Sequence, residues 1–263
     1  MTDAPPSFVS ASDAGSVRTI TMSNPGRMNA VPPDAWTDLA DAFEEFGASD
    51  QRVMILTGDG ENFCAGADMN KARPDVPSAA DNAARMRKTN RVASALHRLS
   101  KPTIAAVDGV AVGAGMNIAI GCDFVIASTR ARFAEIFVKR GLTMDLGGTW
   151  LLPRLVGATR ARELALTGRI VEADEALEIG LVTETVSPEN LALRASQVAV
   201  ELAAGAPLAQ AFVKRALDRS STMTFEQALA FEEQAQGVLL SSEDLIEGAA
   251  AFIEKRPPKF EGR

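Results

Sequence analysis

The 263-residue chain has no tyrosine, one histidine and two cysteines, and each scarcity excludes a kind of chemistry. The single histidine, His97, excludes zinc sites built on two histidines, and Cys64 and Cys122 lie too far apart for a metal knuckle. These cysteines need not form a disulfide, which favours a reducing compartment. Without tyrosine, proton transfer in an active site falls to a carboxylate or to water. We therefore expect no metal site made of His or Cys ligands.

Positive charge and long apolar runs are also scarce. The chain has 27 Lys and Arg against 34 Asp and Glu, a formal charge of −7, which disfavours binding to a phosphate backbone. Its first residues lack the basic and apolar regions of a secretory signal, and no apolar run approaches the roughly 20 residues that span a bilayer. The expectation is a cytoplasmic protein that binds neither nucleic acid nor membrane.

The pattern of apolar residues predicts an α/β protein with parallel strands, because strand and helix signals alternate through the first part of the chain. After about fifteen loose residues, strands are expected at 17–22, 53–56, 103–107 and 124–127, with a weaker signal at 180–182. Helices are expected within 33–47, 79–99, 116–120, 160–167, 172–179, 189–204, 207–220 and 243–255. The C-terminal third is therefore mostly helical.

The last predicted helix follows two capping serines and carries an apolar stripe. This stripe packs on the chain's own core or on a neighbouring subunit, and it consists of Leu245, Ile246, Ala249, Phe252 and Ile253.

Two turns rich in glycine and alanine stand out. The first is Cys64–Asp68, and the second runs from Gly109 to Gly115 before an apolar helix. Small residues let a ligand approach the backbone, and the first N–H groups of a helix have no partner inside it. Two such turns side by side can hold an anionic carbonyl oxygen between two amides. The alternative is that the glycines only permit tight packing.

A third segment places Asp145 among apolar residues directly before Gly147 and Gly148. Apolar surroundings raise the pKa of an aspartate from about 3.9 toward values that suit a general base. Alternatively, Asp145 caps the following helix, and the sequence leaves both interpretations open. A Ser-His-Asp triad is not expected, because it would need His97, which lies in a segment typical of a surface histidine.

Six segments, taken in order, resemble the crotonase family, also called the enoyl-CoA hydratase/isomerase family. They are Asn24-Pro25 with Met28-Asn29-Ala30, Phe63-Cys64-Ala65-Gly66-Ala67-Asp68, Lys101-Pro102 through Gly115, Cys122-Asp123, Gly147-Gly148-Thr149, and Glu247-Gly248 with Ala251-Phe252. The resemblance runs from about residue 17 to the C-terminus, so it does not depend on one glycine turn.

The resemblance implies a spiral of β-β-α units over residues 1–200 and a helical region at 201–263 that builds trimers, often stacked as hexamers. It implies an acyl-CoA thioester as ligand, with coenzyme A as part of the substrate and no separate cofactor. By the same likeness, the thioester oxygen binds the backbone N–H groups of Ala67 and Ala114.

The other binding residues implied by the resemblance fall into three groups. The adenine and pantetheine parts would lie along Arg27, Met28, Ala30, Ala65, Asp68 and Met69, with Lys255 and Lys259 as candidates for the phosphates. The wall of an apolar acyl pocket would be formed by Phe137 with Ile136 and Leu142. Substrate contacts are also expected at Gly66, Gly113 and Asn117.

Departures from the family pattern bear on the reaction. Family hydratases activate water with two glutamates, whose positions align here with Asn117 and Phe137. Neither side chain exchanges a proton, so efficient hydration is not expected. Asp145 falls where some family isomerases carry their single acid/base carboxylate. One carboxylate suffices to take a proton from C2 of a 3-enoyl thioester and return it at C4.

The leading hypothesis is therefore an isomerase that converts 3-enoyl-CoA to 2-enoyl-CoA, with Asp145 as acid and base and the amides of Ala67 and Ala114 as oxyanion hole. An enoyl-CoA hydratase is the alternative, and a non-catalytic acyl-CoA binder is a third hypothesis. The chain is also similar to a 4-chlorobenzoyl-CoA dehalogenase around Asp145. That reaction is disfavoured, because the dehalogenase's histidine and tryptophan positions align with Asn90 and Phe137.

Overall fold

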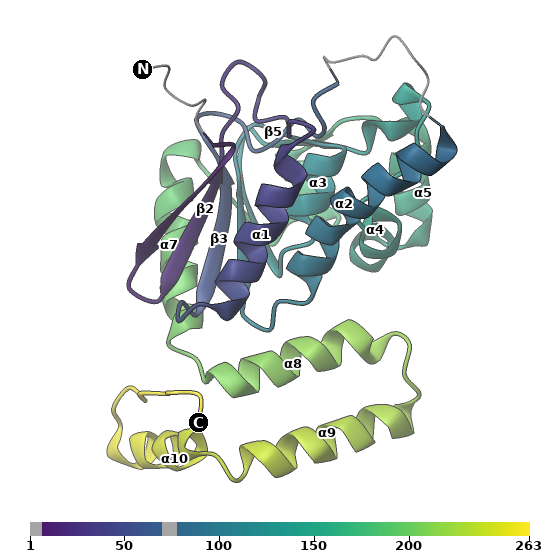
Figure 1. Cartoon of the computed structure of the whole chain (residues 1–263). Coiled ribbons are helices and arrows are strands. Elements are labelled where there is room, and N and C mark those ends of the chain that lie inside the picture. The colour runs from purple at the N-terminus through teal and green to yellow at the C-terminus, as the bar shows by residue number, and fades with distance from the viewer. Residues whose placement is uncertain (1–6, 70–77) are drawn as a thin grey trace.

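A computed structural model describes residues 7–69 and 78–263 (Figure 1). The strands are β1 (Val9–Ala14), β2 (Val17–Met22), β3 (Val53–Gly58), β4 (Thr103–Val107), β5 (Val110–Val112), β6 (Phe124–Ser128), β7 (Arg132–Ala134), β8 (Val171–Glu172) and β9 (Glu184–Val186). The α-helices are α1 (Ala35–Ala48), α2 (Ala79–His97), α3 (Ala114–Ala119), α4 (Gly148–Val156), α5 (Ala158–Thr167), α6 (Ala173–Glu178), α7 (Leu191–Ala203), α8 (Pro207–Ser220), α9 (Phe225–Leu239) and α10 (Glu243–Glu254). Two 3-10 helices are η1 (Ile136–Arg140) and η2 (Pro188–Asn190).

The strands form two sheets that the chain visits in turn. The larger sheet has the order β1-β2-β3-β4-β6-β9, and all its pairs are parallel except β1 with β2. The smaller sheet has the order β5-β7-β8. The chain passes from β4 to β5 and then into α3, and later from β6 to β7 and then into η1. The predicted α/β class, parallel pairing and β-β-α spiral are confirmed.

Helices cover both faces of the larger sheet. In Figure 1, α7 lies on one side of β2 and β3, and α1 and α2 lie on the other. On the α7 face, Ile55, Ile104 and Ile126 pack against Ala195 and Ala199. On the other face, alternate residues of the same strands join a larger core. Burial on both faces explains why these strands are continuous apolar runs in the sequence.

The last three helices lie apart from the sheets. In Figure 1, α8 and α9 run side by side below the sheet, and α10 follows at the end of α9. The Ser242 hydroxyl caps α10 by accepting from Leu245 N–H at 3.2 Å, as the sequence predicts. The apolar stripe of α10 does not pack on the chain's own core, because Ile246 is 72% exposed and Phe252 85%. Within the described ranges, no helix is both long and apolar enough to cross a membrane.

Several elements differ from the sequence expectation: the short strands β5, β7 and β8 and the helix α4 lie outside the expected ranges, and three further differences have a physical reason. The strand β1 lies within the stretch expected to be loose, and it gives no apolar alternation because all but its first residue are exposed. The last strand, β9, begins at Glu184 and not at 180–182, where the side chains of Leu181 and Val182 are buried in a turn. The helix α9 was not expected, and Ala235 is its only buried residue.

Candidate active site

The two glycine-rich turns lie against each other. Cys64 pairs with β5: its N–H donates to Val110 O at 2.8 Å, and its carbonyl oxygen accepts from Val112 N–H at 3.0 Å. On the other side of the same turn, Val31 N–H donates to Gly66 O at 2.7 Å. Backbone hydrogen bonds therefore hold the Cys64–Asp68 turn between β5 and the loop that precedes α1.

Two glycines permit this close approach. A Cβ on Gly66, whose φ is +89°, would lie 2.8 Å from Val112 O and 3.5 Å from the Ala114 nitrogen. A Cβ on Gly115 would lie 2.1 Å from Cys64 O. Side chains at these positions would push the turns apart. The glycines thus serve tight packing, and that packing also brings the first turn close to the amide of Ala114.

The backbone amides of Ala67 and Ala114 are free donors. In residues 7–69 and 78–263, neither N–H group forms a hydrogen bond. The pairing with Val31 uses the carbonyl before Ala67 and the N–H of Asp68 after it, so the amide of Ala67 takes no part. Ala114 is the first residue of α3, whose N-cap is Gly113, and a helix offers no partner to its first N–H groups. Together the two turns present an unused pair of donors.

Asp145 lies in the loop before α4 and is mostly buried. Its backbone oxygen accepts a hydrogen bond from Asn117 Nδ2 at 3.0 Å. Its Oδ1 is buried and has no hydrogen-bond partner among the described residues, and burial raises the pKa of Asp145 to about 6. The N-cap of α4 is Gly147, with no side chain capping the helix, so the interpretation of Asp145 as a helix cap is wrong.

The short helix α3 links the amide pair to the carboxylate. Its first residue is Ala114, and one turn later, about 5 Å along the helix axis, Asn117 bonds the backbone of Asp145. The N-cap residue Gly113 donates to Ala134 O of β7 at 2.8 Å. Ala114, which carries one of the free amides, and Asn117, which holds the backbone of Asp145, therefore lie one helix turn apart on the same short helix.

A second carboxylate at this site was missed in the sequence. Glu135 follows β7 and is 1% exposed, and in the described part of the chain neither carboxylate oxygen has a hydrogen-bond partner. Burial raises its pKa to about 8, and the charge of Asp145 raises it further in the same direction. The side-chain amide of Asn117 faces the carboxylate and opposes the shift, although its well-formed hydrogen bond goes to Asp145 O. The only available signal was its place directly after the alternating Arg132-Phe133-Ala134, which is weak.

The residues predicted to wall the acyl pocket are placed differently from one another. Phe137 is 8% exposed, and its ring comes within 3.7 Å of the Cβ position of Gly113. Ile136 approaches the same position at 3.5 Å. Leu142, by contrast, is 54% exposed. Phe137 and Ile136 thus lie against the second turn, while the side chain of Leu142 is largely exposed to solvent.

An apolar cavity of about 290 Å³ adjoins Asn117. It lies between α2, α3 and α4, and its lining includes Leu96, Ile118, Leu146 and Trp150. Leu146 directly follows Asp145 in the chain, so the loop that carries Asp145 also borders the cavity. This lining could not be deduced from the sequence, because it comes from three separate segments.

The residues predicted to hold the rest of the ligand cluster beside the first turn. Ala65 N–H donates to Met28 O at 2.9 Å, and Ala30 N–H donates to Arg27 O at 3.0 Å. Met28 and Met69 are 51% and 62% exposed. The structure therefore brings together the predicted set Arg27, Met28, Ala30, Ala65, Gly66, Ala67, Asp68 and Met69.

The two lysines predicted for the phosphates are not in this cluster. Lys255 is the C-cap of α10, and Lys259 follows it. Figure 1 shows α10 on the far side of the sheet's lower end, away from β5. Within one chain, the structure does not bring these lysines to the two turns.

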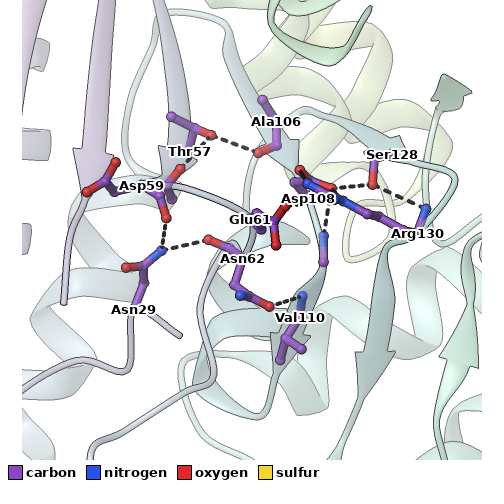
Figure 2. A network of polar contacts seen from close by, with 12 residues as sticks. Asn29, Thr57, Asp59, Glu61, Asn62, Ala106, Asp108, Val110, Ser128 and Arg130 are labelled. Carbon is purple, nitrogen blue, oxygen red and sulfur yellow. Dashed lines mark hydrogen bonds and ion pairs between the residues drawn. The ribbon is translucent and has the colours of Figure 1, made fainter. Parts of the chain in front are cut away.

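A polar network fixes the segments that lead into both turns (Figure 2). Asn29 Nδ2 donates to Asp59 O at 2.9 Å and to Asn62 O at 2.6 Å, and Asn62 Oδ1 accepts from Val110 N–H at 3.2 Å. The side chain of Asn29 therefore ties the loop before α1 to the loop after β3, and Asn62 ties that loop to β5. Because Asn29 is 3% exposed, water does not compete for these bonds.

The same network anchors the turn between β4 and β5. The Asp108 carboxylate accepts from Arg130 at 2.7 and 2.6 Å, from the Ser128 hydroxyl at 2.6 Å and from Gly109 N–H at 2.9 Å (Figure 2). A bidentate Arg–carboxylate pair is directional as well as strong. It therefore fixes the direction in which the chain enters the second turn.

Comparisons with known proteins identify the family. The family model of enoyl-CoA hydratase/isomerase matches residues 12–263. A 1,2-epoxyphenylacetyl-CoA isomerase of Escherichia coli is 38% identical over 94% of this chain and 95% of its own length. A short-chain-enoyl-CoA hydratase of Clostridium acetobutylicum is 39% identical over 94% of both chains. The crystal structure of an enoyl-CoA hydratase from Bacillus anthracis superposes with a TM-score of 0.92 at 31% identity, covering 97% of this chain and all of that one. The chain belongs to the enoyl-CoA hydratase/isomerase, or crotonase, family.

Proposed function

We propose that this protein is an enoyl-CoA isomerase that moves a double bond from the 3,4 to the 2,3 position of an acyl-CoA thioester. The observation that carries the proposal is that α3 connects the free amide of Ala114 with the backbone of Asp145, a residue whose carboxylate pKa burial raises to about 6. A base of this pKa is mostly ionised at neutral pH and still accepts a proton readily. The isomerase name of the Escherichia coli relative supports the same class of reaction.

In the proposed mechanism the thioester oxygen accepts hydrogen bonds from the N–H groups of Ala67 and Ala114. Asp145 removes a proton from C2, and the electron pair moves toward the thioester to give a dienolate whose charge lies on that oxygen. Each amide donor in such a hole is worth about 2.7–4 kcal/mol in the transition state. Asp145 then returns the proton at C4, which leaves the double bond between C2 and C3.

The two parts of the substrate would bind on different sides of the two glycine-rich turns. Coenzyme A would lie along the exposed cluster that includes Arg27, Met28 and Met69. The acyl group would extend past Phe137 toward the apolar cavity beside Asn117, whose volume of about 290 Å³ admits a medium-sized acyl group.

Hydration is the second candidate function, because a second carboxylate is present in Glu135 and the Clostridium acetobutylicum relative is named a hydratase. Hydration requires a group that holds and activates water next to the double bond. Glu135 is 1% exposed, and such burial leaves little room for a reacting water. This burial favours isomerisation over hydration.

The proposal is tested by incubating the protein with 3-hexenoyl-CoA in deuterated water and following conjugation by absorbance and label uptake by mass. We expect a conjugated 2-enoyl product. Hydration of crotonyl-CoA without conjugation of 3-hexenoyl-CoA would favour the hydratase instead. Calorimetric binding of both thioesters with no turnover would favour a non-catalytic binder.

We also propose that further copies of this chain cover the exposed apolar side chains of α9 and α10, giving a homotrimer or hexamer. Phe225, Ile246, Phe252 and Ile253 are each at least 72% exposed in the single chain. Three of these four side chains are on the short helix α10, and large apolar side chains exposed together on one element mark a candidate binding interface. Assembly would also determine whether Lys255 and Lys259 of one subunit approach the ligand of another.

A further inference from the structure

Four buried oxygen atoms have no hydrogen-bond partner among the described residues and lie at the proposed active site, where Asn117 bonds the backbone of Asp145 and both act on Glu135. They belong to three side chains: Asn117 Oδ1, both carboxylate oxygens of Glu135, and Asp145 Oδ1. Within the described ranges, the fifth buried atom of this kind is Gln51 Oε1. Buried polar atoms are almost always paired in folded proteins, so a cluster of acceptors calls for a donor that is not apparent from the heavy atoms.

No described cation supplies that donor. Asp145 is the charged group that faces Glu135, and α3 and β5 contribute no charged residue. Arg169, which follows α5, binds Glu163 and Glu175. The other charged residues of the elements packed around Glu135 are exposed to solvent: Arg132, Lys139, Arg140, Arg160, Arg162, Glu172, Asp174 and Glu178.

Two neighbouring carboxylates that no described cation approaches do not both ionise readily, and the less exposed of the two keeps the proton. Glu135 is 1% exposed, whereas Asp145 is partly exposed. A protonated carboxyl group has an O–H and becomes a donor. A proton on Glu135 would therefore supply the hydrogen that this cluster lacks.

We propose that Glu135 is a positioning residue that carries a proton at neutral pH and donates its O–H into the cluster of Asn117 and Asp145, so that Asp145 is the carboxylate that ionises. Burial, with the charge of Asp145 adding to it, places the pKa of Glu135 at about 8, which agrees with this assignment. The inference rests on the proposed function only for its effect on catalysis. The protonation state itself does not depend on which reaction the protein performs.

The assignment has a consequence for activity at high pH. A neutral Glu135 adds no charge beside the dienolate that forms at the amide pair. When Glu135 ionises, a second negative charge lies next to the base and disfavours that dienolate. The kcat/KM of the wild type should therefore fall above pH 8 as well as below pH 6.

The first experiment uses the wild-type protein and needs no substrate. We would label all glutamates with carbon-13 at the side-chain carboxyl and record infrared difference spectra in deuterated water between pH 6 and pH 10. We expect an isotope-shifted carbonyl stretch of a protonated glutamate at pH 7, which disappears as the pH rises through about 8. The absence of that band at pH 7 would overturn the proposal.

The second experiment compares Glu135→Gln with the exposed control Glu178→Gln. An amide in place of a neutral carboxyl keeps a donor and adds no charge. The fall of kcat/KM below pH 6, the acid limb of the pH profile, should therefore stay in place, and the fall of kcat/KM above pH 8 should disappear. The control should keep both limbs. A shift of the acid limb by about one unit toward lower pH would mean that Glu135 was ionised, and would refute the assignment. If the Gln variant does not fold, the infrared result on the wild type still decides. If no enoyl-CoA is converted, the proposed function fails while the protonation of Glu135 remains measurable.

Discussion

Replacing Asp145 with asparagine should slow the enzyme and stabilise the fold. Burial raises the pKa of Asp145 to about 6, whereas the pKa of an aspartate in the unfolded chain is about 3.9. A shift of about two units corresponds to about 2.9 kcal/mol, which we reduce to about 1–2 kcal/mol because the side chain is partly exposed. Since the native pKa is the higher one, the native state binds the proton more tightly. The free energy of unfolding therefore falls as the pH rises from about 4 to about 6.

The Asp145→Asn variant has no such loss. It should be about 1–2 kcal/mol more stable than the wild type at pH 8. The difference should be about a third as large at pH 4.5, where Asp145 is protonated in the native wild type but already mostly ionised in the unfolded chain. Its kcat on 3-hexenoyl-CoA should be lower by about 10²–10⁴-fold, the contribution expected of a positioned acid/base group. The wild-type kcat/KM should fall as the pH drops below about 6.

Urea unfolding at pH 4.5 and pH 8, at one fixed protein concentration, measures the stability difference. Absorbance of the conjugated thioester measures the activity. The matched control is Asp174→Asn, because Asp174 is exposed on α6 and should change neither quantity. Full activity in Asp145→Asn would refute its role as base. An equal loss of stability at both pH values would refute the reasoning from burial.

Three further variants test the structural basis of the site. Gly66→Ala would place a Cβ 2.8 Å from Val112 O and should lower kcat at least ~10-fold by displacing an amide donor, whereas Gly60→Ala, equally left-handed but with open space around it, should keep activity. Phe252→Ser should shift the assembly toward monomer in light scattering, and an unchanged mass would contradict an interface at α10. Arg130→Gln should cost about 1 kcal/mol in urea unfolding, since it breaks the bidentate pair of Figure 2; an unchanged midpoint would show that the pair adds no net stability.

Much of the fold could be predicted because the buried strands leave a clear pattern. The runs at 53–56, 103–107 and 124–127 are apolar on both faces, since α7 packs on one side of the sheet and α1 and α2 on the other. Where burial is one-sided or absent, the pattern fails. The strand β1 is almost fully exposed and gives no period, and the apolar residues of α9 point mostly to solvent in the single chain.

The sequence predicted those parts of the candidate site that lie in segments with a distinctive local composition. The glycine turns and Asp145 lie in segments whose composition is unusual in itself. Glu135 lies in no such segment. A glutamate that follows a short strand is typical of a surface position. Its environment is created by two other segments, α3 and the loop before α4. Asn117 on α3 lies 18 residues before it in the chain, and Asp145 in the loop lies 10 residues after it. Only the fold reveals that this carboxyl is buried.

Close packing and an oxyanion site are two interpretations of the glycine turns, and the geometry makes them compatible, because the packing itself leaves two amides unpaired among the described residues. The missing Cβ atoms of Gly66 and Gly115 let two backbones approach to contact distance. At that distance the pairing of Cys64 with β5 and of Val31 with the first turn uses the neighbouring peptide groups and leaves the amides of Ala67 and Ala114 unpaired among the described residues. An amide left free in this way is held rigidly before any ligand arrives, so it stabilises a developing oxyanion without reorganisation. A substitution that loosens the packing should therefore reduce kcat more than it raises KM.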